Sequence, residues 1–206
     1  MALRLNGSSS GYVELDVPAA AGSHTLTLPD GGGSSGNFLR TDGSGGLSWA
    51  TPAAGLFESY AILEDQKSAN THGGTFNTGS FLTRDLNTEV ADPDGIVSLS
   101  SNQFTLAAGN YFVVWSAPAY DAGRHKAQLF NATDSTVVAN GSSEISANNG
   151  SEQSRSVGSA RVVITESKAF EIRHRALNGN TTTGFGLASD FGVVEVYTRV
   201  EIYKEA

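Results

Sequence analysis

The chain has 206 residues, a formal net charge of −8 and a charged fraction of only 17%. The acidic balance argues against a non-specific binder of nucleic acids or anionic membranes, which would need a basic surface. No apolar run reaches the roughly 18 residues that cross a bilayer. Cysteine is absent, which excludes disulfides, thiolate zinc sites and cysteine nucleophiles. We therefore expect no nucleic-acid partner, no membrane insertion and no cofactor.

Residues 1–55 are dominated by turn-forming residues, with eleven glycines, eight serines and three prolines. Apolar residues come in alternating pairs such as Leu3/Leu5 and Leu47/Trp49, which is the period of a short strand with one buried face. They are too few to form a core in a monomer. The region is either a flexible linker or a set of short strands completed by other copies of the chain, and the alternation favours the strands.

Residues 56–206 carry many more large apolar side chains and are predicted to form a separate domain. Strands are expected over residues 81–90, 110–116, 160–165, 170–176 and 194–203. The four residues between the third and fourth of these suit a hairpin. Because the strands are short and closely spaced and no helical period is visible, we predict an all-β fold, a β-sandwich or jelly roll.

The last of these strands alternates clearly. Val194, Val196, Val200 and Ile202 are predicted to point one way, and Glu195, Tyr197, Arg199, Glu201 and Tyr203 the other. Tyrosines mixed with charges suit an interface between chains. The alternative is a half-exposed strand with ordinary cross-strand ion pairs.

Three blocks of the first region carry a resemblance to a known family. They are residues 5–15, residues 18–29 and the pattern L-x-T-D-G-S-G-x-L-S-W over residues 39–49. In this order they resemble a module of tail fibres and other virion proteins of tailed bacteriophages. The resemblance implies a virion protein whose N-terminal residues 1–55 form a shaft or attachment region that contacts other virion proteins.

The second region is similar to the head of complement and tumour-necrosis-factor-type proteins. The matching segments are Phe104–Trp115, Ala127–Asn131 and Phe191–Tyr197. The resemblance implies that residues 56–206 form a jelly-roll head that assembles as a homotrimer.

Four histidines are candidates for chemistry. His174 alternates with Phe170 and Ile172 and is predicted to be a hydrogen-bonded core or interface residue, whereas His24 is expected at the surface. His72 and His125 lie in loop-like segments, where recognition residues gather. No two histidines have the spacing of metal ligands, so no metal site is predicted.

The segment Asp92-Pro93-Asp94-Gly95 holds two nearby carboxylates. It is foremost a turn signal, and a calcium site is the alternative. No Gly-x-Ser-x-Gly nucleophile motif is present. We predict that the protein is not an enzyme.

Polar loops over residues 140–158 and 178–186 are the expected exposed tips of the head. Polar side chains can hydrogen-bond sugar hydroxyls, and an aromatic ring can stack on a sugar. The predicted ligand-binding residues are Tyr120, Asp121, His125, His72 and Phe185.

Together the two resemblances imply a phage tail-fibre or receptor-binding protein, located in the virion. It would bind a glycan or protein of the host cell surface. The alternatives are a structural or decoration protein of the phage head or baseplate, and a small carbohydrate-active enzyme.

Overall fold

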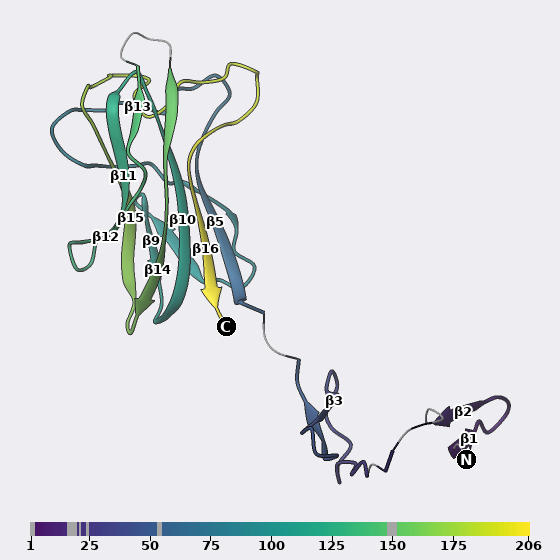
Figure 1. Ribbon diagram of the computed structural model, residues 1–206. Coiled ribbons are helices and arrows are strands. Elements are labelled where there is room, and N and C mark those ends of the chain that lie inside the picture. The colour runs from purple at the N-terminus through teal and green to yellow at the C-terminus, as the bar shows by residue number, and fades with distance from the viewer. Residues whose placement is uncertain (1–2, 16–19, 21, 24, 53–54, 148–151) are drawn as a thin grey trace. The chain divides into compact units, whose positions relative to one another are not determined.

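A computed structural model describes residues 3–15, 20, 22–23, 25–52, 55–147 and 152–206, and the chain divides into two compact units, Met1–Ala53 and Ala54–Ala206 (Figure 1). Every regular element among these residues is a β-strand, which confirms the all-β prediction. The described part of the chain accordingly has no helix that could cross a membrane.

The N-terminal unit contains two short antiparallel pairs. β1 (Leu3–Asn6) pairs with β2 (Tyr12–Leu15), and β3 (Phe38–Thr41) pairs with β4 (Leu47–Ala50). The turn between β3 and β4 is closed by the carboxylate of Asp42, which accepts the N–H groups of Ser44 and Gly46 at 2.7 and 3.0 Å. This local hydrogen bonding explains why the T-D-G-S-G sequence forms a turn at this point.

The apolar side chains of this unit remain on its surface. The exposed ones are Leu5, Tyr12, Leu26, Leu28, Phe38, Leu39 and Trp49. Neither of the two buried apolar clusters of the molecule contains a described residue of this unit. The unit therefore has strands, as predicted, but its described residues form no buried apolar cluster.

The second unit, which we call the head, is a sandwich of two antiparallel sheets. The first sheet has the strand order β14-β10-β16-β5-β7. Its strands are β5 (Phe57–Lys67), β7 (Thr88–Ala91), β10 (Gly109–Tyr120), β14 (Gln153–Ile164) and β16 (Glu195–Glu205).

The second sheet has the order β12-β11-β15-β9-β8, with β13 beside β11 and β6 beside β15. Its strands are β6 (Leu82–Thr83), β8 (Val97–Ser100), β9 (Gln103–Leu106), β11 (Gly123–Asn131), β12 (Thr136–Asn140), β13 (Glu144–Ser146) and β15 (Lys168–Ala176). The chain crosses repeatedly between the two sheets, which is the jelly-roll arrangement that the sequence predicts.

One predicted pairing is wrong. Residues 160–165 and 170–176 do fall largely in strands, but β14 pairs with β10 in the first sheet whereas β15 pairs with β11, β9 and β6 in the second. The short connection between them is therefore a crossover between sheets and not a hairpin. Its length alone could not distinguish the two.

The predicted long strand over residues 81–90 is also wrong, because the chain changes sheets within it. β6 pairs with β15, and β7 pairs with β5 of the other sheet. Between them Arg84 is fully buried and Leu86 is 2% exposed. The chain leaves the second sheet at Arg84, whose side chain is buried between the two sheets.

The alternation of the last strand is interrupted by a bulge. The register of β16 against β5 shifts between Val196 and Arg199. Tyr197 and Thr198 are consequently both buried, while Val196 is exposed. Val200 and Ile202 point into the core and Glu201 and Tyr203 outward, as predicted. The predicted outward Glu195 and Tyr197 are buried instead, and the predicted inward Val194 and Val196 are exposed.

The main core lies between the sheets and is built from alternating inward residues of both. Its largest members are Trp115, Tyr111, Phe104, Phe170 and Leu129. A smaller cluster, formed by Phe76, Ala119, Ala122, Ala176 and Phe185, fills one end of the sandwich.

The head has two different ends (Figure 1). The chain enters and leaves at one of them, where the Ala206 N–H donates to the Leu56 carbonyl at 3.4 Å. The opposite end, which we call the loop end, carries the connections over residues 68–81, 121–122 and 177–194. Because the smaller apolar cluster lies beneath these connections, they rest on a packed base.

Gly158 of β14 provides a test of the core packing. A Cβ atom at this position would overlap the indole ring of Trp115, which is 1% exposed and has little room to move. We expect Gly158→Ala to lower the free energy of unfolding by about 1–3 kcal/mol, the usual cost of overpacking. The exposed neighbour Ser159→Ala is the control and should stay within about 0.5 kcal/mol of the wild type in urea titrations. Equal stabilities of the two variants would contradict this packing.

Candidate functional site

The connections at the loop end are held to one another by backbone hydrogen bonds. Gly73 N–H donates to the Gly186 carbonyl at 2.9 Å, and the Tyr120 N–H donates to the Gly184 carbonyl at 3.1 Å. Phe76 and Asn180 exchange both of their backbone hydrogen bonds at 2.8 Å. The loop end is therefore a braced structure rather than a set of independent loops.

Arg84 lies beneath these connections and ties them to the sheets. Its guanidinium donates to the Thr198 hydroxyl at 2.8 Å, the Pro118 carbonyl at 3.1 Å and the Phe185 carbonyl at 2.8 Å. It also lies 3.9 Å from the centre of the Phe185 ring, a cation–π contact. Burial lowers the pKa of Arg84 to about 9, so the group stays charged at neutral pH.

Phe185 is therefore occupied from within the head. Its side chain is 7% exposed, and its ring lies 4.8 Å from that of Phe76 in addition to the contact with Arg84. The prediction that Phe185 stacks on a sugar does not fit this position, because Phe76 and Arg84 already pack against its ring.

The prediction that His125 lies in a loop is wrong. His125 lies on β11, where it is 4% exposed. Its Nδ1 atom lies 2.9 Å from Nε2 of His174, and its Nε2 atom lies 2.8 Å from the Ser154 hydroxyl. Burial lowers the pKa of His125 to about 4. Burial and the charge of Arg84 hold the pKa of His174 well below its usual value. His174 is thus the hydrogen-bonded core histidine that its alternation predicts.

The other predicted ligand-binding residues lie at the loop end. His72 is half-buried, and its Nδ1 atom accepts the N–H of Ala188 at 3.1 Å. Tyr120 ends β10, and Asp121 follows in the turn with a φ of 52° and an N–H bond to the Glu152 carbonyl at 3.1 Å. The structure brings these residues to one end of the head, and their contact with a ligand stays a prediction. His24 lies outside the described residues.

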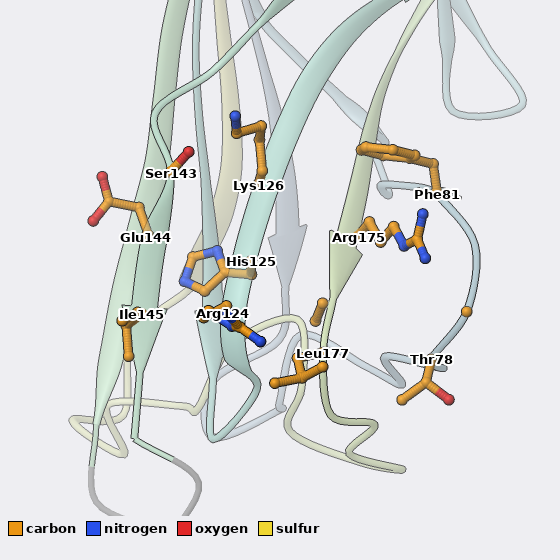
Figure 2. Close-up of a pocket in the computed structure, with 12 residues that line it drawn as sticks. Thr78, Phe81, Arg124, His125, Lys126, Ser143, Glu144, Ile145, Arg175 and Leu177 are labelled. Atoms are coloured by element: carbon orange, nitrogen blue, oxygen red, sulfur yellow. The ribbon is translucent and has the colours of Figure 1, made fainter.

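A groove of about 720 Å³ opens on the outer face of the second sheet near the loop end (Figure 2). It is lined by Thr78, Gly79, Phe81, Arg124, His125, Lys126, Ser143, Glu144, Ile145, Arg175, Ala176 and Leu177. His125 is the only one of the five predicted ligand-binding residues in this lining. The volume lies within the range of small-molecule sites, about 300–1,000 Å³.

Three cationic side chains project from neighbouring strands into this groove. Arg124 and Lys126 lie two residues apart on one face of β11, and Arg175 on β15 is the direct cross-strand partner of Lys126. Within the described part of the chain, none of the three forms an ion pair or a hydrogen bond through its side chain. Arg40 in the N-terminal unit is the one other Lys or Arg of which this is true.

The groove also has one acidic group and an apolar rim. Glu144 is the only carboxylate in the lining, and in Figure 2 its carboxylate points away from the Arg175 guanidinium. Ile145 and Leu177 are 65% and 54% exposed. The groove therefore combines an excess of positive charge with exposed apolar side chains.

Sequence reasoning found His125 but not the groove around it. The available signal was the spacing of Arg124/Lys126 and of Arg173/Arg175, which places each pair on one face of a strand. The register that sets Lys126 beside Arg175 is a tertiary feature that one sequence does not reveal. Arg173 itself is not part of the cluster, because it pairs with Glu171 and lies over the Phe130 ring.

The Asp92–Gly95 segment is a turn, as predicted. The Asp92 carboxylate accepts the N–H groups of Ile96 and Val97 at 2.8 and 3.0 Å, and Asp94 accepts the Ser59 hydroxyl. Gly95 has a φ of 64°. Both carboxylates are engaged within the protein, and the described residues contain no group of three or more acidic or histidine side chains placed to hold a metal ion.

Comparison with known proteins finds no matching family model and no matching curated protein. Among solved structures, the globular domain of zebrafish complement 1qA is similar over 70% of this chain and 95% of its own, at 12% identity and a TM-score of 0.45. Murine APRIL is similar over 71% of this chain and 98% of its own, at 8% identity and a TM-score of 0.44. At these values the likeness says nothing about ligand, partner or origin.

The buried histidine pair predicts a loss of stability in acid. The unfolded chain takes up protons below pH 6.5 whereas folded His125 stays neutral until the pH nears 4, so lowering the pH favours unfolding. We expect the free energy of unfolding to fall by on the order of 3 kcal/mol between pH 6.5 and pH 4 because of this group.

His125→Gln is the matched comparison. The pKa of Asp65 is raised by burial and acts in the opposite direction, so the histidine contribution is the difference between wild type and variant. In urea titrations the variant should lose less stability than the wild type over this range, although His174 remains. Parallel pH profiles would contradict the account.

Proposed function

We propose that this chain is a non-enzymatic attachment protein of a bacteriophage virion, which binds the host cell surface as a homotrimer through the loop end of its head. The observation that supports this most is the polarity of the head. The chain enters and leaves at one end, and the braced connections and the cationic groove lie towards the other. One end is thus free for binding while the other continues into the N-terminal unit.

An aromatic row on the first sheet supports assembly. Phe112 is the cross-strand partner of Tyr203, which in turn pairs with Tyr60, and the Phe57 ring lies 5.0 Å from that of Tyr203. Phe57 and Tyr60 are 43% and 44% exposed in the single chain. Aromatic clusters of this kind are typical of interfaces between chains.

A hollow of about 700 Å³ adjoins this row where the chain enters the head. Leu56, Phe57, Phe112 and Ala206 line it, and Leu56 is 85% exposed. A second copy of the chain would cover this apolar surface, and the three-fold order follows from the resemblance to complement and tumour-necrosis-factor-type heads.

The exposed strands of the N-terminal unit support the same reading. Its leucines and aromatic side chains alternate as if one face were buried, yet Leu5, Leu26, Leu28, Phe38 and Leu39 are 45–69% exposed. Contact with other copies, or with other virion proteins, would bury them. Three heads held together would present three sites at once. The avidity of the trimer would then exceed the affinity of a single site.

The alternatives differ in what the loop end does. A structural or decoration protein of the phage head or baseplate would share the assembly but bind no cell. A glycosidase needs two carboxylates about the scissile bond, and the groove holds Glu144 alone.

The test is binding of the labelled full chain to a panel of bacterial strains. We expect micromolar protein to bind at least one strain, with binding blocked by polysaccharide extracted from that strain and no reducing sugar released from it. Failure to bind any strain would favour the structural alternative, and release of reducing sugar would establish the enzyme.

A further inference from the structure

We propose that the cationic groove binds an acidic polysaccharide, one whose sugars carry carboxylate or sulfate groups. This inference rests on the proposed attachment function and names the chemistry of the ligand. Its starting point is that a chain with a net charge of −8 keeps three unpaired cations together in one groove.

The unpaired state of these cations is unusual within this molecule. Elsewhere in the head, lysines and arginines are engaged: Arg161 with Glu205, Lys168 with Asp134 and Glu166, and Lys204 with Glu58. Arg124, Lys126 and Arg175 lie on one face of two neighbouring strands without such a partner among the described residues. Anionic groups on a ligand would supply the missing partners, and an arginine can bind a carboxylate or sulfate through two parallel hydrogen bonds.

The rest of the lining suits sugars. Phe81, Ile145 and Leu177 offer apolar surfaces for the C–H faces of sugar rings, and Thr78 and Ser143 carry hydroxyl groups. Figure 2 shows Arg175 between Phe81 and Leu177, so charge and apolar surface alternate along this wall. His125 adds no positive charge at neutral pH, because burial lowers its pKa to about 4.

The strands beneath the groove argue against an extended peptide. β11 pairs with β15 on one side and with β12 and β13 on the other, and β15 pairs with β11 on one side and with β6 and β9 on the other. Among the described residues, β11 and β15 are therefore paired on both sides, so neither of these two strands can take up a peptide as an added strand.

The position of the groove is compatible with the proposed trimer. The groove opens on the outer face of the second sheet, and the aromatic row lies on the outer face of the first sheet. Association through the aromatic row would leave the opposite face of each sandwich open.

The experiment measures binding of the full chain to defined polymers by titration calorimetry. The probes are polygalacturonate, which carries carboxylates, dextran sulfate, which carries sulfates, and two comparison polymers, neutral dextran and polyglutamate. We expect at least one acidic polysaccharide to bind more tightly than both comparison polymers. Whichever of polygalacturonate and dextran sulfate binds more tightly shows whether the groove prefers carboxylate or sulfate groups.

Arg175→Gln should weaken this binding about tenfold or more, because each lost contact is a hydrogen bond between charged groups. Arg40→Gln is the matched control, since it removes an equally unpaired arginine from the other unit and should leave affinity unchanged. Leu177→Ser should also weaken binding, which separates a built groove from general attraction between charges. Unchanged thermal unfolding would show that the variants remain folded.

The proposal is overturned if neither acidic polysaccharide binds, if polyglutamate binds more tightly than both, or if Arg40→Gln weakens binding as much as Arg175→Gln. Because purified polymers are used, the result is independent of the cell assay. Binding to cells that is unaffected by Arg175→Gln would leave the attachment function standing and refute the groove. Binding to the polymer without binding to cells would support the groove and refute the attachment function.

Discussion

The buried guanidinium of Arg84 is the interaction on which the loop end depends. A charge is costly to bury unless its donors are satisfied, and Arg84 meets this requirement with Thr198, Pro118 and Phe185, which belong to three separate segments. The same charge disfavours protonation of His174. One side chain thus joins the segment between β6 and β7, the bulge of the last strand and the connection over residues 177–194. Burial is the main cause of the lowered pKa values of His125 and His174, and the charge of Arg84 acts in the same direction.

The two outer faces of the sandwich have different chemistry. The first sheet carries an aromatic row around Phe112 and Tyr203 that a single chain leaves uncovered. The second sheet carries the groove, whose cations Arg124, Lys126 and Arg175 have no partners within the described chain. Apolar surface is stabilised by another protein surface, and unpaired charge by a counter-charge. The proposed division follows from this, with assembly on one face and ligand binding on the other.

The sequence predicted individual strands better than their partners. The run of aromatic and β-branched residues placed the central strand over residues 110–116 correctly, because such residues favour strands. The sequence did not reveal that the chain changes sheets within residues 81–90 and within residues 160–176. The residues of a strand do not show which sheet the strand joins. For the site, sequence identified His125 and His174 as residues of interest, but their contact and the neighbouring groove depend on register. The burial of Arg84 could not be predicted, because its neighbours in the sequence do not distinguish a buried arginine from an exposed one.

The native mass of the full chain tests most directly the claim that copies of the chain bury the aromatic row. The account predicts three times the 21.4 kDa of one chain in sedimentation equilibrium. Phe112→Asp should shift the protein towards the single-chain mass by placing a charge in the interface, whereas Val137→Asp, on the exposed part of β12, should leave the mass unchanged. A wild-type chain that sediments as a monomer at micromolar concentrations would contradict the account, and so would a trimer that Phe112→Asp leaves intact.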